Sequence, residues 1–185
     1  GLRVHIGAQI VVRGCRFTAN RAVSGNGGAL YADQNPVQVF DSAFDANQAI
    51  EGGAAFLFQS TGAVVQDSSI TNNRASGGAG IQAFGGHVRL VSNEVHHNIA
   101  SAFGGGIVLT EAAYGEVLSN QIHNNTGGID GGGVTFQDGA AGLLSNNVIS
   151  FNQAAEAGGG VKIYDHASPT VRNNFLEGNR ARDGA

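Results

Sequence analysis

Residues 131–152 read GGGVTFQDGAAGLLSNNVISFN and contain every part of a pattern that runs through the whole chain. Three glycines come first, followed by residues that alternate apolar, polar and apolar. Leu144 lies five positions before a second apolar residue, Ile149, and Asn152 follows three positions after that. Because self-similarity at a fixed period is the mark of a repeat architecture, we searched the rest of the chain for the same order.

The asparagine recurs seven times, and successive asparagines are 25 to 27 residues apart. Each one follows an apolar residue by three positions, and a further aliphatic residue lies five positions before that apolar residue. The asparagines are Asn20, Asn47, Asn73, Asn98, Asn125, Asn152 and Asn179. The apolar residues before them are Phe17, Phe44, Ile70, Val95, Ile122, Ile149 and Leu176, and the earlier aliphatic residues are Val12, Val39, Val65, Leu90, Val117, Leu144 and Val171.

Each glycine step opens a segment whose apolar residues alternate with a period of two, which is typical of a strand and not of a helix. In the second repeat we expect Phe56 and Phe58 to be the inward pair. A period near 26 residues without a helical segment excludes helical repeats and leucine-rich horseshoes. The sequence therefore predicts an all-β, right-handed parallel β-helix of about seven coils of 25–27 residues, with three short strands per coil, over residues 1–185 as one domain.

The repeated asparagines have a physical reason. Asparagine tolerates the left-handed backbone of a sharp turn, and its side-chain amide can bond the same amide in the next coil. We therefore expect a buried ladder from Asn20 to Asn179. A second polar column, two residues before the apolar position, predicts another ladder, in which Cys15 is a small buried member. That column is Cys15, Ser42, Ser68, Asn93, Asn120, Asn147 and Asn174.

Composition limits the kinds of partner. The net charge is −4, only 13% of residues are charged, and no basic face stands out, which argues against binding to nucleic acid or to an anionic membrane. The single cysteine cannot form an intrachain disulfide, and no apolar stretch approaches the length of a membrane span. The pattern begins and stops partway through a coil, so we expect a segment of a longer solenoid, covered end-on by further coils or by another chain at Val12 and Phe17 and at Val171 and Leu176.

The repeats resemble those of a known family. Gly27-Gly28-Ala29-Leu30 and the FxxN motif from Phe44 to Asn47 are similar to the GGA(I/L) and FxxN repeats of chlamydial polymorphic outer-membrane autotransporters. Residues 168–174, SPTVRNN, resemble the parallel β-helix repeat of bacterial secreted and surface proteins, a superfamily that also contains pectate lyases. After the second coil FxxN becomes IxxN or VxxN. The resemblance implies the fold and a secreted or cell-surface location, and it transfers no catalytic residue.

One acidic column is the best candidate for chemistry. Glu111, Asp138 and Asp165 are 27 residues apart, so they fall about one coil apart on the same side. Carboxylates in this arrangement could hold Ca²⁺ or act as an acid/base pair on a polysaccharide. The alternative is that they cap turns at strand ends, as Asp138-Gly139 suggests. The neighbouring residues that could assist catalysis or binding are Lys162, Tyr164 and His166.

Histidines form a second candidate. His96 and His123 occupy the same position in adjacent coils, with Glu94 beside them, so two imidazoles and a carboxylate could share a metal ion. The alternative is a pair of solvated histidines on a polar strand face, since no third ligand stands at a fixed spacing.

Two functions remain open. The first is a rigid extracellular module, a shaft or adhesin segment that binds a glycan or a surface protein through its side. Regular coils without long insertions favour it, because active sites of solenoids are usually built where loops lengthen. The second is a polysaccharide lyase, a hydrolase or a polysaccharide-binding domain that uses the acidic column.

Overall fold

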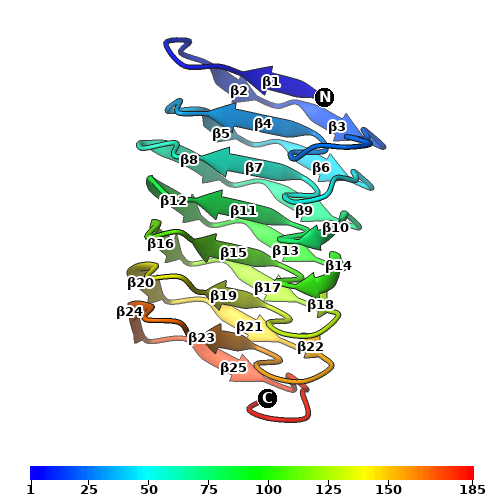
Figure 1. The fold of residues 1–185 in the computed structure, drawn as a ribbon, viewed down its shortest axis with the longest axis vertical. Coiled ribbons are helices and arrows are strands. Elements are labelled where there is room, and N and C mark those ends of the chain that lie inside the picture. The colour runs from blue at the N-terminus through cyan, green and yellow to red at the C-terminus, as the bar shows by residue number, and fades with distance from the viewer.

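A computed structural model describes residues 1–185, and its regular elements are all β-strands. Successive coils lie on top of one another from the N-terminus to the C-terminus, as Figure 1 shows. Strands that follow one another in the chain belong to different sheets, and they pair in parallel with the equivalent strands of the coils before and after. The parallel solenoid of about seven coils is thus confirmed. No helix that could cross a membrane is present.

Three sheets have seven strands and one has four. Sheet A contains β1 (Leu2–Val4), β4 (Leu30–Asp33), β7 (Ala55–Phe58), β11 (Ile81–Phe84), β15 (Ile107–Thr110), β19 (Val134–Phe136) and β23 (Val161–Ile163). Sheet B contains β2 (Val11–Arg13), β5 (Gln38–Phe40), β8 (Ala63–Gln66), β12 (His87–Val91), β16 (Tyr114–Leu118), β20 (Ala141–Ser145) and β24 (Ser168–Arg172). Sheet C contains β3 (Arg16–Thr18), β6 (Ala43–Asp45), β9 (Ser69–Thr71), β13 (Glu94–His96), β17 (Gln121–His123), β21 (Val148–Ser150) and β25 (Phe175–Glu177). Sheet D contains β10 (Arg74–Gly77), β14 (Ile99–Phe103), β18 (Thr126–Gly127) and β22 (Gln153–Ala154).

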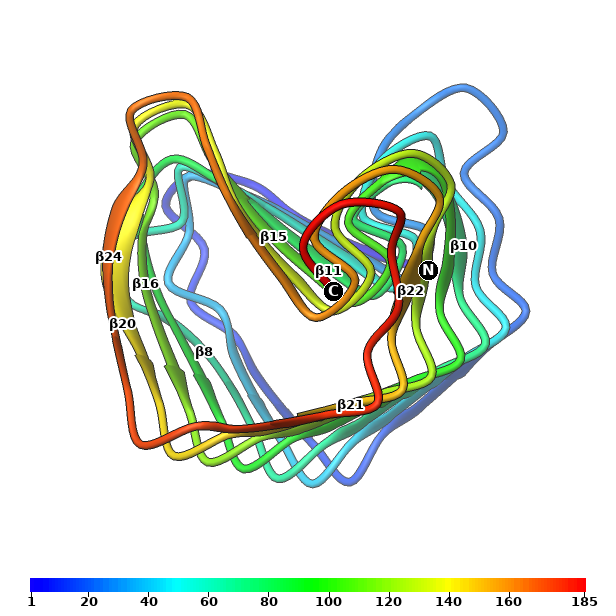
Figure 2. The same cartoon turned by 90° about the horizontal axis from the view of Figure 1, so that it is seen from below.

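Sheet D is a fourth strand position that the sequence pattern did not predict. After each ladder asparagine the middle coils stay extended for a few residues, and Ala75, Ala100, Gly127 and Ala154 stack in register there. Figure 2, which looks along the stack, shows that this segment bends back toward sheet A before the glycine step. The small side chains allow that close return.

The interior between sheets A, B and C is filled by the predicted columns. The aliphatic column in sheet B pairs in register from Val39 to Leu144 and is buried, and so is the sheet C column from Phe44 to Ile149. In the first coil Val12 is already buried and Phe17 is packed against the core. In the last coil Val171 is 46% exposed and Leu176 is 47% exposed.

The inward pair of the second coil was predicted wrongly. Ala55 pairs with Leu30 and Leu57 pairs with Ala32, so Ala55 and Leu57 face the core while Phe56 and Phe58 face outward. The reason is that the turn glycine of this coil is Gly52, whose φ is +62°, and the alternation must be counted from there. The outward rings stack on aromatic residues of neighbouring coils, Phe56 on Tyr31 and Phe58 on Phe84.

Both polar ladders form. Every ladder asparagine before the last coil donates from its amide to the side-chain oxygen of the next coil, as from Asn98 to Asn125 at 2.9 Å and from Asn120 to Asn147 at 3.0 Å. The left-handed residue, however, is the one before the ladder asparagine, for example Asn124 with φ +54°. That residue points outward, so the asparagine after it can point inward.

Cys15 belongs to the second column by register, since its N–H donates to Ser42 Oγ, but its side chain is exposed and not buried. It lies in the first coil, where no strand covers its other side.

Candidate functional site

One column of side chains on the outer face of sheet A is closed to solvent, and we call it the closed outer column. This column includes Phe56, Gln82, Val108 and Thr135, which are at most 3% exposed although they point away from the core. The glycine turns cover them: a Cβ at Gly104 would collide with Val108, and one at Gly131 would collide with Thr135. Both glycines have positive φ. The repeated glycine is thus required for close contact as well as for the turn.

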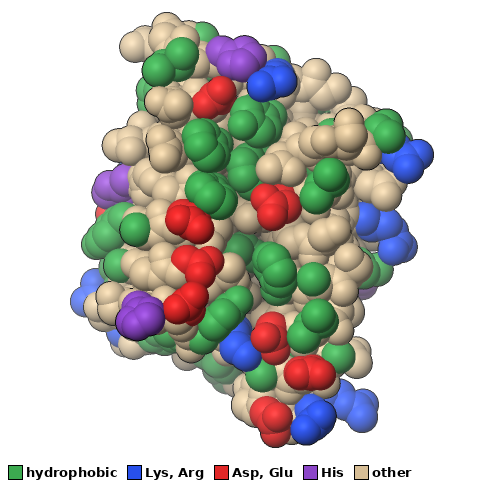
Figure 3. All heavy atoms as spheres, viewed as in Figure 1, with side chains coloured by type: hydrophobic (Ala, Val, Ile, Leu, Met, Phe, Trp, Pro, Cys, Tyr) green, Lys and Arg blue, Asp and Glu red, His purple; other side chains and the backbone are tan.

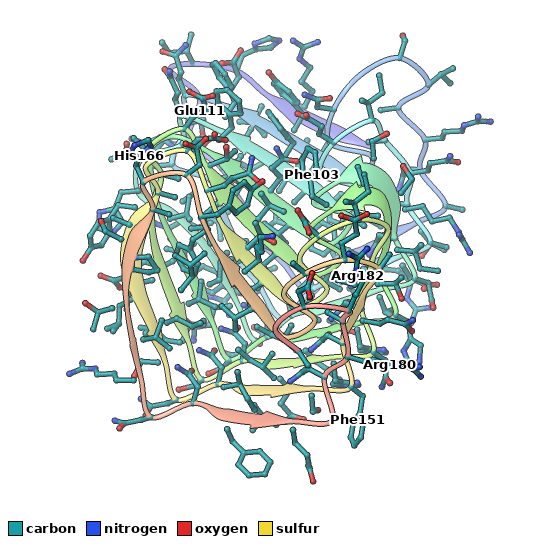
Figure 4. The ribbon with its side chains drawn as sticks, turned by 60° about the horizontal axis from the view of Figure 1, so that its bottom comes forward. Phe103, Glu111, Phe151, His166, Arg180 and Arg182 are labelled. Atoms are coloured by element: carbon teal, nitrogen blue, oxygen red, sulfur yellow. The ribbon has the colours of Figure 1, made fainter.

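The acidic column lies at the edge of the same face, in the turns between sheets A and B. Glu111, Asp138 and Asp165 all have a left-handed backbone, with φ between 51° and 54°. This is the position that the turn interpretation predicts. Glu111 and Asp165 are exposed, and Figure 4 shows Glu111 and His166 at the outer corner of the coils. Figure 3 shows acidic side chains gathered over this face.

Asp138 is held by two neighbours that the sequence did not identify. Thr110 Oγ1 donates to Asp138 Oδ2 at 2.5 Å, and Gln137 Nε2 donates to the same oxygen at 2.8 Å. The hydrogen bond from Thr110, and then that from Gln137, lowers the pKa of Asp138. The carboxylate is therefore ionised at neutral pH and has no proton to give to a leaving group.

Lys162 and Tyr164 join the same network one coil later. Tyr164 Oη donates to Gln137 Oε1 at 2.6 Å, and burial, followed by the charge of Asp138, raises the pKa of Tyr164. Lys162 Nζ lies 3.2 Å from Asp130 Oδ1 and 5.2 Å from the centre of the Tyr164 ring. His166 stands apart from the network with 93% of its side chain exposed, next to Asp165.

The structure joins Asp138 and Tyr164 by hydrogen bonds through Gln137 and places Lys162 over the Tyr164 ring, in an ion pair with Asp130. Glu111 and His166 lie outside this network. Thr110, Gln137 and Asp130 are the members that sequence reasoning missed. Thr110 and Gln137 share one register position in adjacent coils, directly before the acidic column. Their shared position, directly before the acidic residues, is the sequence signal that could have identified them.

The second candidate brings His96, His123 and Glu94 together on the outer face of sheet C, with His97 as an additional neighbour. Glu94 Oε1 is 3.9 Å from His96 Nε2 and 3.6 Å from His123 Nε2. The two rings are stacked, with centroids 4.9 Å apart and an interplanar angle of 3°. His96 Nδ1 lies 2.7 Å from His97 Nδ1. Burial is the main cause of the lowered pKa of His96.

The stacked arrangement of His96 and His123 argues against a metal ion shared by the two rings. The lone pairs of two parallel rings run side by side and do not meet at one point, whereas a shared metal ion needs them to converge. No group of three or more His, Cys, Asp or Glu side chains in the chain is arranged to hold a metal ion. Neither the histidine cluster nor the acidic column therefore has a preformed metal geometry.

Two polar hollows flank sheet C. One, of about 440 Å³, runs across three coils at the turn between sheets B and C and is lined by no apolar residue. The other, of about 230 Å³, lies at the turn between sheets C and D. The first is lined by Asp67, Ser68, Ser69, Ser92, Asn93, Glu94, Ser119 and Gln121. The second is lined by Asn72, Arg74, His97, Ile99, Asn124 and Thr126.

Comparison with protein families gives one match, to the family described as "Right handed beta helix region", over residues 29–183. Neither the curated proteins nor the solved structures contain a match to this chain. The family match extends over most of the stacked coils, from the end of the first glycine step to the last turn. With its parallel sheets and its two internal ladders, the chain belongs to the right-handed β-helix family.

Proposed function

We propose that this chain is a rigid, non-catalytic β-helix module at the cell surface or outside the cell, and that it binds a glycan through its side. The observation that supports a non-catalytic role is the ionised, hydrogen-bonded state of Asp138 in the acidic column. Its central member, Asp138, accepts hydrogen bonds from Thr110 and Gln137 and stays ionised. A glycosidase needs one carboxylic acid that donates a proton to the leaving group, and the ionised Asp138 does not fill that role.

The 440 Å³ hollow beside sheet C, which we call the polar groove, is the surface that best fits a glycan. Its hydroxyls at Ser69, Ser92 and Ser119 and its amide at Gln121 make no hydrogen bond within the protein. Such groups are free to exchange hydrogen bonds with the hydroxyls of a sugar. Because the groove crosses three coils, it offers the same kind of group repeatedly along the stack, as a polymer of similar units requires.

The extracellular location is supported by the resemblance of the GGA(I/L) and FxxN repeats to autotransporter passenger segments. A long stack of hydrogen-bonded coils is also suited to a shaft, because each coil is stabilised by both of its neighbours.

The test is a screen of neutral and acidic polysaccharides for binding and for cleavage, with and without Ca²⁺. We expect retention of a polysaccharide without new chain ends. Gln121→Trp, which fills the polar groove from an exposed strand position, should abolish that retention. Val148→Trp is the matched control, because Val148 is the paired, 43% exposed residue of the next coil and lies outside the groove.

New chain ends that disappear in Asp138→Asn would overturn the non-catalytic assignment. Equal retention by Gln121→Trp and Val148→Trp would overturn the assignment of the groove.

A further inference from the structure

Three of the seven residues in the outward column that runs along sheet D are arginines, and none of the three has an acidic partner. The register of this face is Arg21, Gln48, Arg74, Ile99, Thr126, Gln153 and Arg180. It contains no aspartate or glutamate, and none of its three guanidinium groups is within ion-pair distance of a carboxylate. The protein has a net charge of −4, and acidic side chains are gathered over sheet A. The column along sheet D differs because its only charged residues are arginines.

The 230 Å³ hollow, which we call the Arg74 pocket, opens on this column. Arg74 and His97 stand on its walls together with Thr126 and Asn124, and no carboxylate lines it. The Arg74 guanidinium and the Thr126 hydroxyl make no hydrogen bond within the protein. His97 uses Nδ1 toward His96 and leaves Nε2 free. Two groups with unused donors, Arg74 and Thr126, and the free Nε2 of His97 therefore surround one small space.

Charged and titratable groups surround His97 on several sides. His96 and His123 lie beside it on β13 and β17, Glu94 on β13 faces both of their rings, and Arg74 on β10 lies across the pocket. From β6, Asp45 accepts a hydrogen bond from Asn72 at 2.9 Å. A histidine ring that carries its positive charge is a donor at both nitrogens.

We propose that the Arg74 pocket binds a small oxyanion, the sulfate or carboxylate group of an anionic ligand. A guanidinium group presents two parallel N–H donors that match two oxygens of such a group. The Thr126 hydroxyl supplies a further donor, and so does His97 Nε2 when it carries a proton. The Arg74 pocket is on the opposite side of sheet C from the polar groove. This inference does not depend on the proposed glycan binding.

The test is a titration of the ¹⁵N-labelled chain with sodium sulfate and, separately, sodium acetate at pH 6 and constant ionic strength, followed by nuclear magnetic resonance. We expect saturable shifts confined to the residues that line the Arg74 pocket, including Arg74, His97 and Thr126. Saturation by sulfate alone assigns a tetrahedral group, and saturation by acetate alone assigns a carboxylate. Because hydrogen bonds to charged groups are the strong ones, Arg74→Gln should weaken binding at least about tenfold.

Glutamine already occupies this column at Gln48 and Gln153, so Arg74→Gln is compatible with the fold. Arg172→Gln, at an exposed arginine of sheet B, is the matched control and should leave binding unchanged. His97→Ala should also weaken binding, because it removes the imidazole from the wall of the pocket. Shifts spread evenly over all arginines without saturation, or equal binding by Arg74→Gln and the wild type, would overturn the proposal.

Discussion

Replacing one ladder asparagine tests the internal hydrogen bonds most directly, and Asn125→Leu is the sharpest choice. Asn125 is fully buried. Its Oδ1 accepts from Asn98 Nδ2 at 2.9 Å and from the Asn98 backbone N–H at 3.1 Å, and its Nδ2 donates to Asn152 Oδ1 at 3.0 Å. Leucine has nearly the same size and branching, so it leaves no room for a water that could replace these bonds.

The substitution leaves two N–H bonds of Asn98, one from the backbone and one from the side chain, without an acceptor, and each buried unsatisfied group costs about 1 to 3 kcal/mol. Burial of the leucine side chain returns about 1.5 to 3 kcal/mol. The expected net loss is about 2 kcal/mol, which in a chain of this size lowers the midpoint of thermal unfolding by roughly 4 to 8 °C.

Thermal unfolding followed by circular dichroism measures this effect. Gln121→Leu is the matched control, because Gln121 is an exposed amide in the same coil with no hydrogen bond to the protein, and such surface changes stay within about 0.5 kcal/mol. Glu116→Leu is a second control, where the loss of the exposed ion pair with Arg89 costs at most about 1 kcal/mol. An Asn125→Leu protein as stable as either control would refute the role assigned to the ladder.

Two further pairs of variants test the closed outer column of sheet A. Gly104→Ala and Gly139→Ala both place alanine at positive φ, at a cost of about 1 to 2 kcal/mol, but only at Gly104 does the new Cβ also collide with Val108. Chemical unfolding should therefore show Gly104→Ala as the less stable of the two, and the reverse order would contradict the packing reason for the glycine. Thr135→Val should raise the unfolding midpoint, because Thr135 Oγ1 is buried without a hydrogen-bond partner, whereas Thr110→Val should lower it by removing the donor to Asp138. Equal effects of the two threonine variants would show that the hydroxyl environments are not different.

The spacing of residues in the sequence was enough to predict the stacked-coil architecture. Apolar residues and asparagines recurring every 25 to 27 residues can be buried together only if the coils stack in register, so the solenoid, its aliphatic columns and both ladders followed from spacing alone. The spacing also placed Glu111, Asp138 and Asp165, and likewise His96 and His123, in shared columns.

Whether a side chain points into or out of the coil depended on the backbone conformation at the turns. Whether Phe56 faces inward or outward depends on which glycine makes the turn, and a shift of one residue reverses every side chain of a strand. The left-handed residue before each asparagine could not be identified from its type, because alanine, histidine and phenylalanine all occupy that position.

The chemistry of the candidate sites was decided by the tertiary structure. A column of carboxylates has the same spacing whether its members are free or bound, and only the contacts of Thr110 and Gln137 show that Asp138 is an ionised acceptor. Two histidines one coil apart can in principle chelate or stack, and the parallel rings of His96 and His123 show that they stack. Spacing along the chain fixes which residues are neighbours, but the direction of each side chain, and with it the chemistry, depends on packing between coils.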